Sequence, residues 1–287
     1  MRLGTLKGQG GAVLTDDGAY LLPDGLTVGD LLAQGLERTL EHGSTAARGS
    51  PLPYGPESLE LPYFPTSVRD FVTFESHVEG VRRSIEGSPG VPEAWYDAPT
   101  FYFTNPHALY GPGQPIPKPE RCHALDYEME VGAVVGPDLE IVGYTIVNDW
   151  SARDIQAREM QVGLGPAKGK DFATSIGPWV VTADELAPYL TDDGFLDLDC
   201  QAFVNGERLG HDRLSHMRWT FAEMVAYAVR DSVVKPGDLL ASGTTGGGGC
   251  LAELWGRNGE RTPPPLEIGD VVRLEVEGIG TLEAAIA

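Results

Sequence analysis

Two glutamates, Glu128 and Glu130, lie two residues apart in a segment that alternates apolar and acidic side chains, residues 125–135. Such alternation predicts a strand, in which residues i and i+2 project from one face about 7 Å apart. The next apolar segment, 141–147, ends beside Asp149, so antiparallel pairing would add a third carboxylate. Converging carboxylates suit Mg²⁺, Mn²⁺ or Ca²⁺, and no Cys or His ligand spacing accompanies them to favour zinc. The alternative is a solvent-facing edge strand.

An arginine and a glutamine follow the third carboxylate. A helix that begins near Ser151 would place Arg153, Gln156 and Met160 on one face, so that a guanidinium and an amide project together. Because arginine pairs well with carboxylates and phosphates, this face is suited to hold an anionic ligand. The alternative is an arginine that pairs with surface acids.

A glycine-rich segment, residues 163–174, contains two of the five lysines of the chain, Lys168 and Lys170. Its glycines do not have the spacing of a dinucleotide-binding loop, and no G-K-[ST] motif follows them. We therefore interpret the segment as a loop that can deliver one of these lysines to a site.

One histidine, His77, shares a predicted helix with a carboxylate. Apolar residues at steps of three and four predict that helix over residues 71–85, with Asp70 and His77 on a neighbouring face. A histidine in this setting is either structural or a general base. No G-x-S-x-G, H-E-x-x-H or Cys–His arrangement supplies a nucleophile, so water would be the nucleophile of a hydrolase.

The elements that must position these residues begin after an N-terminal unit. Residues 12–14 and 20–22 predict a hairpin, and Thr27 is expected to cap a single helix that ends near Gly43. Prolines then interrupt residues 44–67, because each proline removes a backbone donor. We place a domain boundary there, with a small N-terminal domain at 1–66 and a catalytic domain at 67–287.

The rest of the chain reads as strands with interposed helices. An Asn-Gly turn at 205–206 predicts a hairpin, and Thr220 with Glu223 predicts a capping box before a helix at 221–229. The further predicted strands are residues 101–103, 201–204, 239–241, 271–277 and 281–286. With 37 glycines and 22 prolines and no internal repeat, the chain is expected to be α+β and mainly β.

Composition excludes several classes of protein. The 287 residues include 21 Lys and Arg against 42 Asp and Glu, a formal charge of −21, which excludes a nucleic-acid binder that relies on phosphate contacts. No segment approaches the ~18 apolar residues of a membrane span, and the N-terminal residues lack the apolar core of a signal peptide. The three cysteines are far apart and predict no disulfide framework, which fits a reducing cytoplasm.

Taken together, these motifs resemble the fumarylacetoacetate hydrolase family over about residues 65–285. The matching features occur in the family's order and are listed here: Asp70 with His77, the Glu128-x-Glu130 pair, the run N-D-W-S-A-R-D from Asn148 to Asp154, the Gly169-Lys170 loop that ends at Thr174, and the segment from Pro236 through Thr244 to Glu253. The resemblance implies a mixed β-sandwich or rolled sheet, preceded by a small N-terminal domain and assembled as a homodimer.

The resemblance also implies roles for individual residues. It implies a divalent ion, commonly Mg²⁺, on Glu128, Glu130 and Asp149, with Asp70 as a possible fourth ligand. His77 matches the general base that activates water, and Glu253 matches the acid that orients such a histidine. The positions that match substrate-binding residues of the family are Arg153, Gln156, Lys170 and Thr244. Two further substrate positions hold tyrosine in the enzyme that names the family and hold Val72 and Met160 here.

The implied activity is hydrolysis of a carbon–carbon bond in a 2,4-dioxo or 3-oxo acid, of the kind met in the breakdown of aromatic compounds. The metal would polarise the carbonyl of a chelated substrate, Lys170 would help to carry the developing charge, and His77 would deprotonate water. The alternatives are a decarboxylase, hydratase or isomerase of a related oxo or enol acid on the same metal site, or an inactive cation-binding protein.

Overall fold

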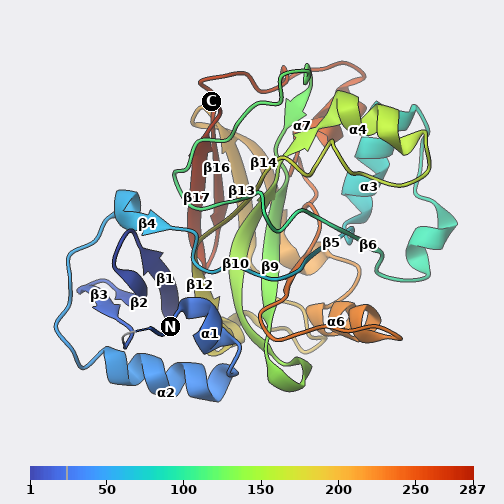
Figure 1. Ribbon diagram of the computed structural model, residues 1–287. Coiled ribbons are helices and arrows are strands. Elements are labelled where there is room, and N and C mark those ends of the chain that lie inside the picture. Colours follow the sequence, from blue (N-terminus) through green and yellow to red (C-terminus); the bar gives the residue numbers. More distant parts are fainter. Residues whose placement is uncertain (24) are drawn as a thin grey trace.

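The computed structural model describes residues 1–23 and 25–287, without the side chains of Ile85 and Glu86. Most strands of the described chain belong to one mixed eleven-stranded sheet, in which nine run in the order β3-β2-β1-β12-β10-β9-β15-β5-β6, β4 pairs with β1 and β7 pairs with β12 (Figure 1). Its strands are β1 (Arg2–Leu6), β2 (Gly10–Thr15), β3 (Gly18–Leu21), β4 (Leu59–Glu60), β5 (Val68–Phe71), β6 (Phe101–Phe103), β7 (Leu109–Tyr110), β9 (Met129–Val135), β10 (Ile141–Asp149), β12 (Thr174–Thr182) and β15 (Leu239–Ala241).

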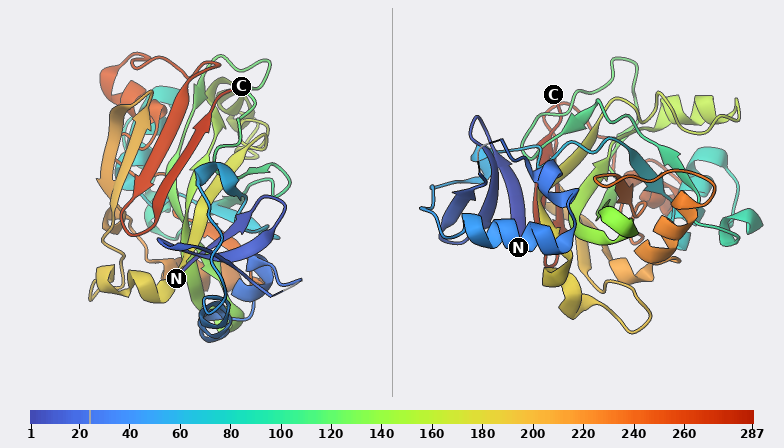
Figure 2. Two further views of the ribbon diagram at one scale, coloured as in Figure 1. Left: turned by 90° about the vertical axis from the view of Figure 1, so that its left-hand side faces the viewer. Right: turned by 60° about the horizontal axis from the view of Figure 1, so that its bottom comes forward.

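A second sheet packs against this one, so the mainly β sandwich is confirmed. Its order is β14-β13-β16-β17, from β13 (Asp199–Val204), β14 (Glu207–Arg213), β16 (Val271–Val276) and β17 (Gly280–Ala285). Figure 2 shows the two sheets as adjacent layers. Val131 and Ile146 of the large sheet share one buried core with Ala202, Leu274 and Leu282 of the small one. Two short strands, β8 (Leu125–Asp126) and β11 (Ser151–Ala152), pair separately.

Helices surround the sheets. The α-helices are α1 (Val28–Leu32), α2 (Leu36–Ala46), α3 (Glu75–Val81), α4 (Arg153–Met160), α5 (Ala183–Leu186), α6 (Phe221–Val229) and α7 (Leu251–Asn258). A π-helical turn (Arg82–Glu86) extends α3, and single 3-10 turns cover Pro56–Ser58, Glu93–Tyr96, Pro137–Leu139, Ala187–Tyr189 and Leu214–His216. No helix in the described residues is long and apolar enough to cross a membrane.

The N-terminal unit follows the prediction except in its helix. The hairpin forms as β2 and β3, and Thr27 caps α1 in a capping box with Asp30. The single helix expected to end at Gly43 is instead two helices, because Gly35 breaks it with a positive φ of 95°. Gly43 lies inside α2 and packs so closely on Met1 that a Cβ there would lie 2.2 Å from the Met1 sulfur.

The helix predicted over residues 71–85 is also shorter than expected. Phe71 ends strand β5, and α3 begins only at Glu75. Asp70 therefore lies on a strand and not on a face of the His77 helix, since its backbone pairs with Ala241 of β15 and Tyr102 of β6. The side chain of Ile85, the last member of the predicted stripe, lies outside the described residues.

The strand predicted over residues 125–135 is interrupted. It divides into β8 and β9, with Tyr127 and Glu128 between them. Every residue of β9 is buried, because apolar clusters cover both faces of the sheet here. The solvent-facing alternative for Glu128 and Glu130 is therefore wrong. The Asn-Gly turn and the Thr220–Glu223 capping box are confirmed.

Candidate active site

One cavity of about 390 Å³ collects most of the residues selected from the sequence. Those that line it are Asp70, Val72, His77, Glu128, Glu130, Arg153, Gln156, Met160, Lys170 and Thr244. Asp149 lies just behind this lining, since Lys170 bridges its carboxylate to Glu128. The pairing of β5, β15, β9 and β10 explains the convergence, because neighbouring strands place Asp70, Glu130 and Asp149 in one part of the sheet.

The acids of the cavity differ in their pKa values and therefore in how readily they ionise. Burial raises the pKa of Asp70 and of Glu130 well above the usual carboxylate range, and the neighbouring carboxylates add to this effect. Burial would also raise the pKa of Glu128, yet Arg153 and Lys170 outweigh it and hold that pKa well below its usual value. The cluster therefore combines one firmly ionised carboxylate with neighbours that favour a proton or a cation.

Three of these acids suit a divalent cation. One carboxylate oxygen from each of Asp70, Glu128 and Glu130 lies within 4.8 Å of the others. Glu130 Oε2 and Asp149 Oδ1 are buried without a hydrogen-bond partner. Buried oxygens of this kind are costly unless a proton or cation satisfies them, and an all-oxygen set is the preference of Mg²⁺, Mn²⁺ and Ca²⁺. The residues present thus fit the implied ion.

Asp149 is held by two donors. Its Oδ2 accepts hydrogen bonds from Lys170 Nζ and from the Tyr102 hydroxyl, each at 2.5 Å. Lys170 also contacts Glu128, and the two acids outweigh the effect of burial and raise the lysine pKa, so the side chain is cationic. Lys168, the other lysine of the loop, is exposed and pairs with Asp171. Tyr102 also lines the cavity. It was not selected as a site residue, although it lies in the predicted strand at residues 101–103, where all three residues are aromatic.

Arg153 is buried at the first residue of α4, which begins two residues later than predicted, so the surface-pair alternative is wrong. Its guanidinium donates to Asp126 Oδ2 at 2.8 Å, Glu128 Oε1 at 2.6 Å and Gln156 Oε1 at 3.1 Å. Asp126 belongs to the alternating acids of residues 125–135 but was not selected as a site residue, because its spacing gives no sign of a partner 27 residues away. Arg153 therefore orients Glu128 in addition to lining the cavity.

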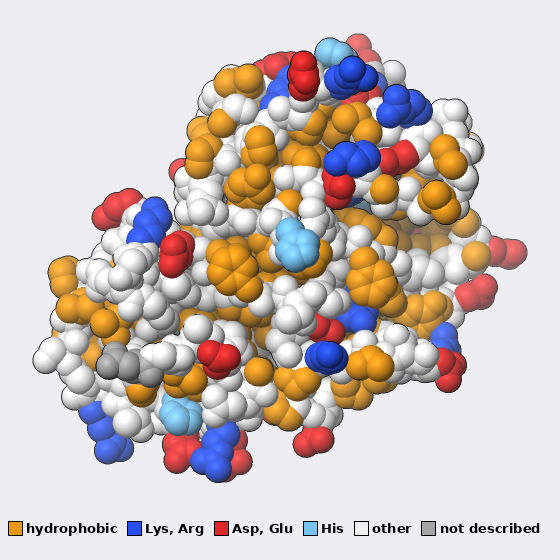
Figure 3. Space-filling model, in the orientation of Figure 1, with side chains coloured by type: hydrophobic (Ala, Val, Ile, Leu, Met, Phe, Trp, Pro, Cys, Tyr) orange, Lys and Arg blue, Asp and Glu red, His pale blue; other side chains and the backbone are white. Residues whose placement is uncertain are grey.

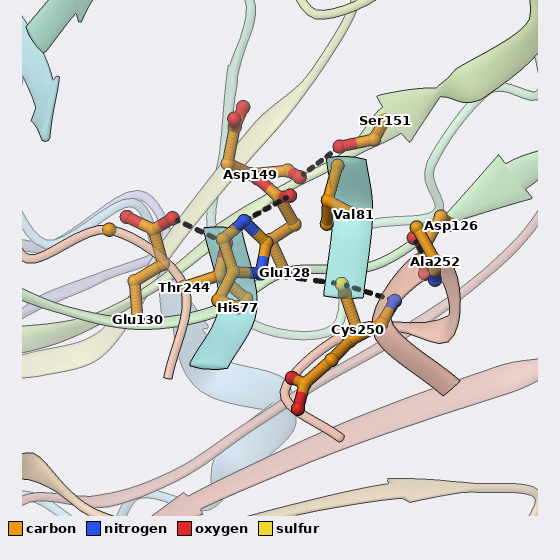
Figure 4. A network of polar contacts seen from close by, with 12 residues as sticks. His77, Val81, Asp126, Glu128, Glu130, Asp149, Ser151, Thr244, Cys250 and Ala252 are labelled. Atoms are coloured by element: carbon orange, nitrogen blue, oxygen red, sulfur yellow. Dashed lines mark hydrogen bonds and ion pairs between the residues drawn. The ribbon is translucent and has the colours of Figure 1, made fainter. Parts of the chain in front are cut away.

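His77 lies between an acid and a thiol, as Figure 4 shows. Its Nε2 is 3.7 Å from Glu128 Oε1, and its Nδ1 is 3.6 Å from Cys250 Sγ. Burial lowers the pKa of His77 to about 4, although Glu128 opposes this effect. The imidazole is therefore neutral near pH 7 and able to accept a proton.

Glu253 does not contact His77. This acid lies on α7, where its carboxylate pairs with Arg257 one turn later and accepts from the Gly248 N–H at 3.2 Å. The group beside His77 Nδ1 is instead the thiol of Cys250, which also caps α7. The direct orienting contact expected for Glu253 is thus wrong, because an i,i+4 arginine engages the carboxylate.

Thr244 reaches the cavity through the glycine-rich loop after β15. Its hydroxyl donates to Glu130 Oε1 at 3.3 Å. Gly243 has a φ of 79°, and a Cβ there would lie 2.3 Å from the Phe71 carbonyl oxygen. Only glycine permits the close approach that brings Thr244 to β5.

A mixed β-sandwich with buried carboxylates, a lysine and a histidine around one cavity is the arrangement expected of the fumarylacetoacetate hydrolase family. The profile of the fumarylacetoacetate (FAA) hydrolase C-terminal domain matches residues 66–287, and the chain belongs to this family. Fumarylacetoacetase of Oryza sativa subsp. japonica is 30% identical over 73% of the chain. The chain covers 64% of that relative, less than two thirds of its length.

Solved structures share the fold over the whole chain. The 5-carboxymethyl-2-hydroxymuconate delta-isomerase of Mycobacterium smegmatis has a TM-score of 0.68 at 25% identity and covers 100% of this chain and 99% of its own. Maleylpyruvate hydrolase of Sphingobium sp. SYK-6, in complex with manganese(II) and pyruvate, has a TM-score of 0.70 at 20% identity with the same coverage. Enzymes with this fold therefore include hydrolases and isomerases.

Proposed function

We propose that the protein is a metal-dependent hydrolase that cleaves a carbon–carbon bond in a 2,4-dioxo or 3-oxo acid of the fumarylacetoacetate or acylpyruvate type. One observation carries this proposal: a buried, neutral histidine and a set of cation-ready carboxylates line the same cavity. The histidine supplies a base for water, and the carboxylates supply a place for the ion that binds the oxo acid.

The proposed ligands are Glu128, Glu130 and Asp149, with Asp70 as a fourth. The manganese(II) ion and pyruvate in the related maleylpyruvate hydrolase support a divalent ion and an oxo acid in this fold. When bound, Mg²⁺, or Mn²⁺ or Ca²⁺ in its place, would polarise the oxo-acid carbonyl and stabilise the negative charge that develops on bond cleavage.

His77 is the proposed base. The tautomer with its hydrogen on Nδ1, toward Cys250 Sγ, leaves Nε2 free to take a proton from water. The water oxygen adds to the acyl carbonyl, the bond between that carbon and the oxo-acid carbon breaks, and the electron pair leaves with the oxo acid. The proton held on Nε2 is then delivered to the oxo-acid carbon that received the electron pair. An acylpyruvate thus yields a carboxylic acid and pyruvate, and a substrate of the fumarylacetoacetate type yields a carboxylic acid and a 3-oxo acid.

The cationic side chains act on the acids and on the substrate. Lys170 stays protonated, and its Nζ neutralises Glu128 and Asp149 while its place in the cavity lining also lets it bind a substrate oxygen. Arg153 holds Glu128 in place through Nη2, and its Nη1 donates a hydrogen bond to Gln156 Oε1. Gln156 and Thr244 are the proposed neutral partners of substrate oxygens, whereas Val72 and Met160 shape the walls.

A second reaction class remains a candidate. The isomerase of Mycobacterium smegmatis shares the fold over the whole chain, and isomerisation, hydration or decarboxylation of an oxo or enol acid would use the same carboxylates. A decarboxylase or isomerase needs no water activated by His77. Release of CO₂ without a second organic product would identify decarboxylation, and metal binding without turnover of any oxo acid would identify an inactive cation-binding protein.

The test is turnover of acylpyruvates and fumarylpyruvate with Mg²⁺, before and after addition of EDTA. We expect activity that EDTA abolishes, and a His77→Gln variant slowed about 10²- to 10⁴-fold because the general base is lost. His107→Gln, at an exposed histidine that does not line this cavity, is the matched control and should retain activity. Undiminished turnover in EDTA or in His77→Gln would contradict the proposal.

A further inference from the structure

The structure also bears on which acyl group the cavity accepts, an inference that rests on the proposed function. We propose that the acyl part of the substrate is short and apolar and carries no carboxylate of its own. The chemical class is then an acylpyruvate with an alkyl or aryl acyl group, in contrast to a diacid such as a fumaryl- or maleyl-substituted oxo acid.

Two helices show a change from polar to apolar lining. On α3 the polar His77 is followed one turn later by Val81, about 6 Å along the axis. On α4 the polar Arg153 and Gln156 are followed by Met160, about 6 Å beyond Gln156. The cavity therefore has a polar part beside the carboxylates and an apolar part that both helices extend.

The apolar residues that line the cavity include Val72, Val78, Val81, Phe101, Met160 and Pro166. None of these apolar side chains can donate a hydrogen bond to a carboxylate. The exposed Thr100, which also lines the cavity, offers only a neutral hydroxyl. Burying an ionised carboxylate among apolar groups is strongly unfavourable unless a charge pairs with it.

The cationic residues that line the described cavity already have acceptors within the protein. Arg153 and Lys170 bind Asp126, Glu128 and Asp149. The third, Arg82, donates from Nη1 to the Gly90 carbonyl at 2.7 Å. A carboxylate on the acyl group would have to compete with these acceptors, and it would also enter a site that already holds four acids.

The size of the cavity limits the acyl group further. Its volume of about 390 Å³ lies near the lower end of the ~300 to 1,000 Å³ typical of small-molecule sites. The oxo-acid portion and its ion occupy the polar part of that space. A chain of a few carbons, or one ring, remains as the acyl group that fits.

The test compares two acids of equal chain length, 2,4-dioxoheptanoate and 2,4-dioxoheptanedioate, which differ only in a terminal methyl or carboxylate. We expect kcat/KM of the Mg²⁺-loaded protein to be at least about tenfold higher for the monoacid, the scale of discrimination by apolar pocket contacts. Direct binding of both acids is measured by calorimetry in parallel. Tighter binding of the monoacid without turnover would support this inference and contradict the proposed hydrolysis.

Two variants test whether the substrate preference is set by the cavity lining and not by charge elsewhere on the surface. Met160→Arg places a cation at the rim, where Met160 is 39% exposed, and should shift the preference about tenfold toward the diacid. Val162→Arg, at a 72% exposed position outside the lining, is the matched control and should leave the ratio unchanged. Equal or better binding and turnover of the diacid would overturn the inference. Loss of that binding and turnover in Arg82→Gln would then identify Arg82 as the partner of the second carboxylate.

Discussion

At the scale of single residues, position decides how each acid behaves. Glu128 and Glu130 are two residues apart and equally buried, yet the pKa of the first is held low and that of the second is raised. Burial acts on both, but Arg153 and Lys170 reach Glu128, whereas Glu130 faces other carboxylates. The site thus keeps one fixed charge beside carboxyl groups whose raised pKa values favour the protonated form.

This difference predicts proton release on metal binding. Because the raised pKa values of Asp70 and Glu130 favour protonated carboxyls, a divalent ion must displace those protons, and its affinity must rise with pH. Between about pH 5 and pH 8 we expect the Mg²⁺ association constant to increase by up to about tenfold per pH unit for each proton released. Calorimetry in buffers of different ionisation enthalpy measures the number of protons released when the ion binds.

Asp70→Asn provides the comparison for this measurement. The variant should release fewer protons than the unaltered protein and bind the ion more weakly, since one ligand and one titrating group are removed. Glu128 should release none, because its low pKa keeps it ionised throughout. A pH-independent association constant would contradict the combination of raised pKa values and metal ligation at Asp70 and Glu130.

The residues that could be predicted from the sequence are those in dense local motifs. Glu128, Glu130 and Asp149 were found from strand spacing, and the structure confirms that they are buried together. Cys250 could not be found, because its contact with His77 joins positions 173 residues apart. Glu253 was given a contact that the structure lacks, since sequence matching does not show that Arg257 engages it.

At the scale of elements, Asp126 connects three segments. Its Oδ1 accepts from the Leu251 N–H at 2.7 Å, and its Oδ2 accepts from the Ala252 N–H at 3.0 Å and from Arg153 Nε at 2.8 Å. The carboxylate thereby joins β8 to the first turns of α4 and α7. These N–H groups at the start of α7 have no partner within the helix, so the acid satisfies them.

Replacing this acid should destabilise the protein. Asp126→Ala leaves the buried Arg153 without one of its partners, and breaking such a pair costs about 3–5 kcal/mol. We expect a loss of this size in the free energy of unfolding, measured by urea denaturation, together with weaker Mg²⁺ binding because Glu128 loses its support. Asp199→Ala, at a partly exposed pair with His211, should cost less than about 1 kcal/mol. Equal losses in both variants would contradict this role.

Elements could be predicted where local and tertiary preferences agree. The β2–β3 hairpin, the Asn-Gly turn and the capped helix α6 were predicted correctly, because each has its own local signal. The helix expected from residue 71 was wrong at its start, since pairing with β15 and β6 draws Asp70 and Phe71 into the sheet. The periodicity of apolar residues in one segment does not show which distant segment it will pair with as a strand.

At the scale of the whole molecule, the N-terminal unit is continuous with the large sheet. Strand β1 pairs with β12, and one buried cluster contains Leu3, Val13 and Leu31 together with Val180 and Leu239. The boundary near residue 66 and the homodimer stay predictions. On the face in Figure 3, apolar side chains gather in the middle while many charged side chains lie toward the outline.

Removing residues 1–60 should therefore do more than shorten the chain. It would expose the apolar cluster around Val180 and leave the β1-paired part of β12, Val180 and Val181, without a partner strand, which favours aggregation. We expect the truncated chain to lose its cooperative thermal transition, measured by circular dichroism, or to precipitate. A truncated chain that stays monodisperse and unfolds cooperatively would establish that the catalytic part folds alone.

In the proposed reaction, His77 activates water beside a carboxylate-bound divalent ion. The most direct test of this step is hydrolysis of an acylpyruvate in ¹⁸O-labelled water by the Mg²⁺-loaded protein, with mass spectrometry of the released carboxylic acid. We expect one ¹⁸O atom in the carboxyl group of that acid, in a reaction that EDTA stops and His77→Gln slows about 10²- to 10⁴-fold. Turnover that yields no ¹⁸O-labelled acid would contradict it.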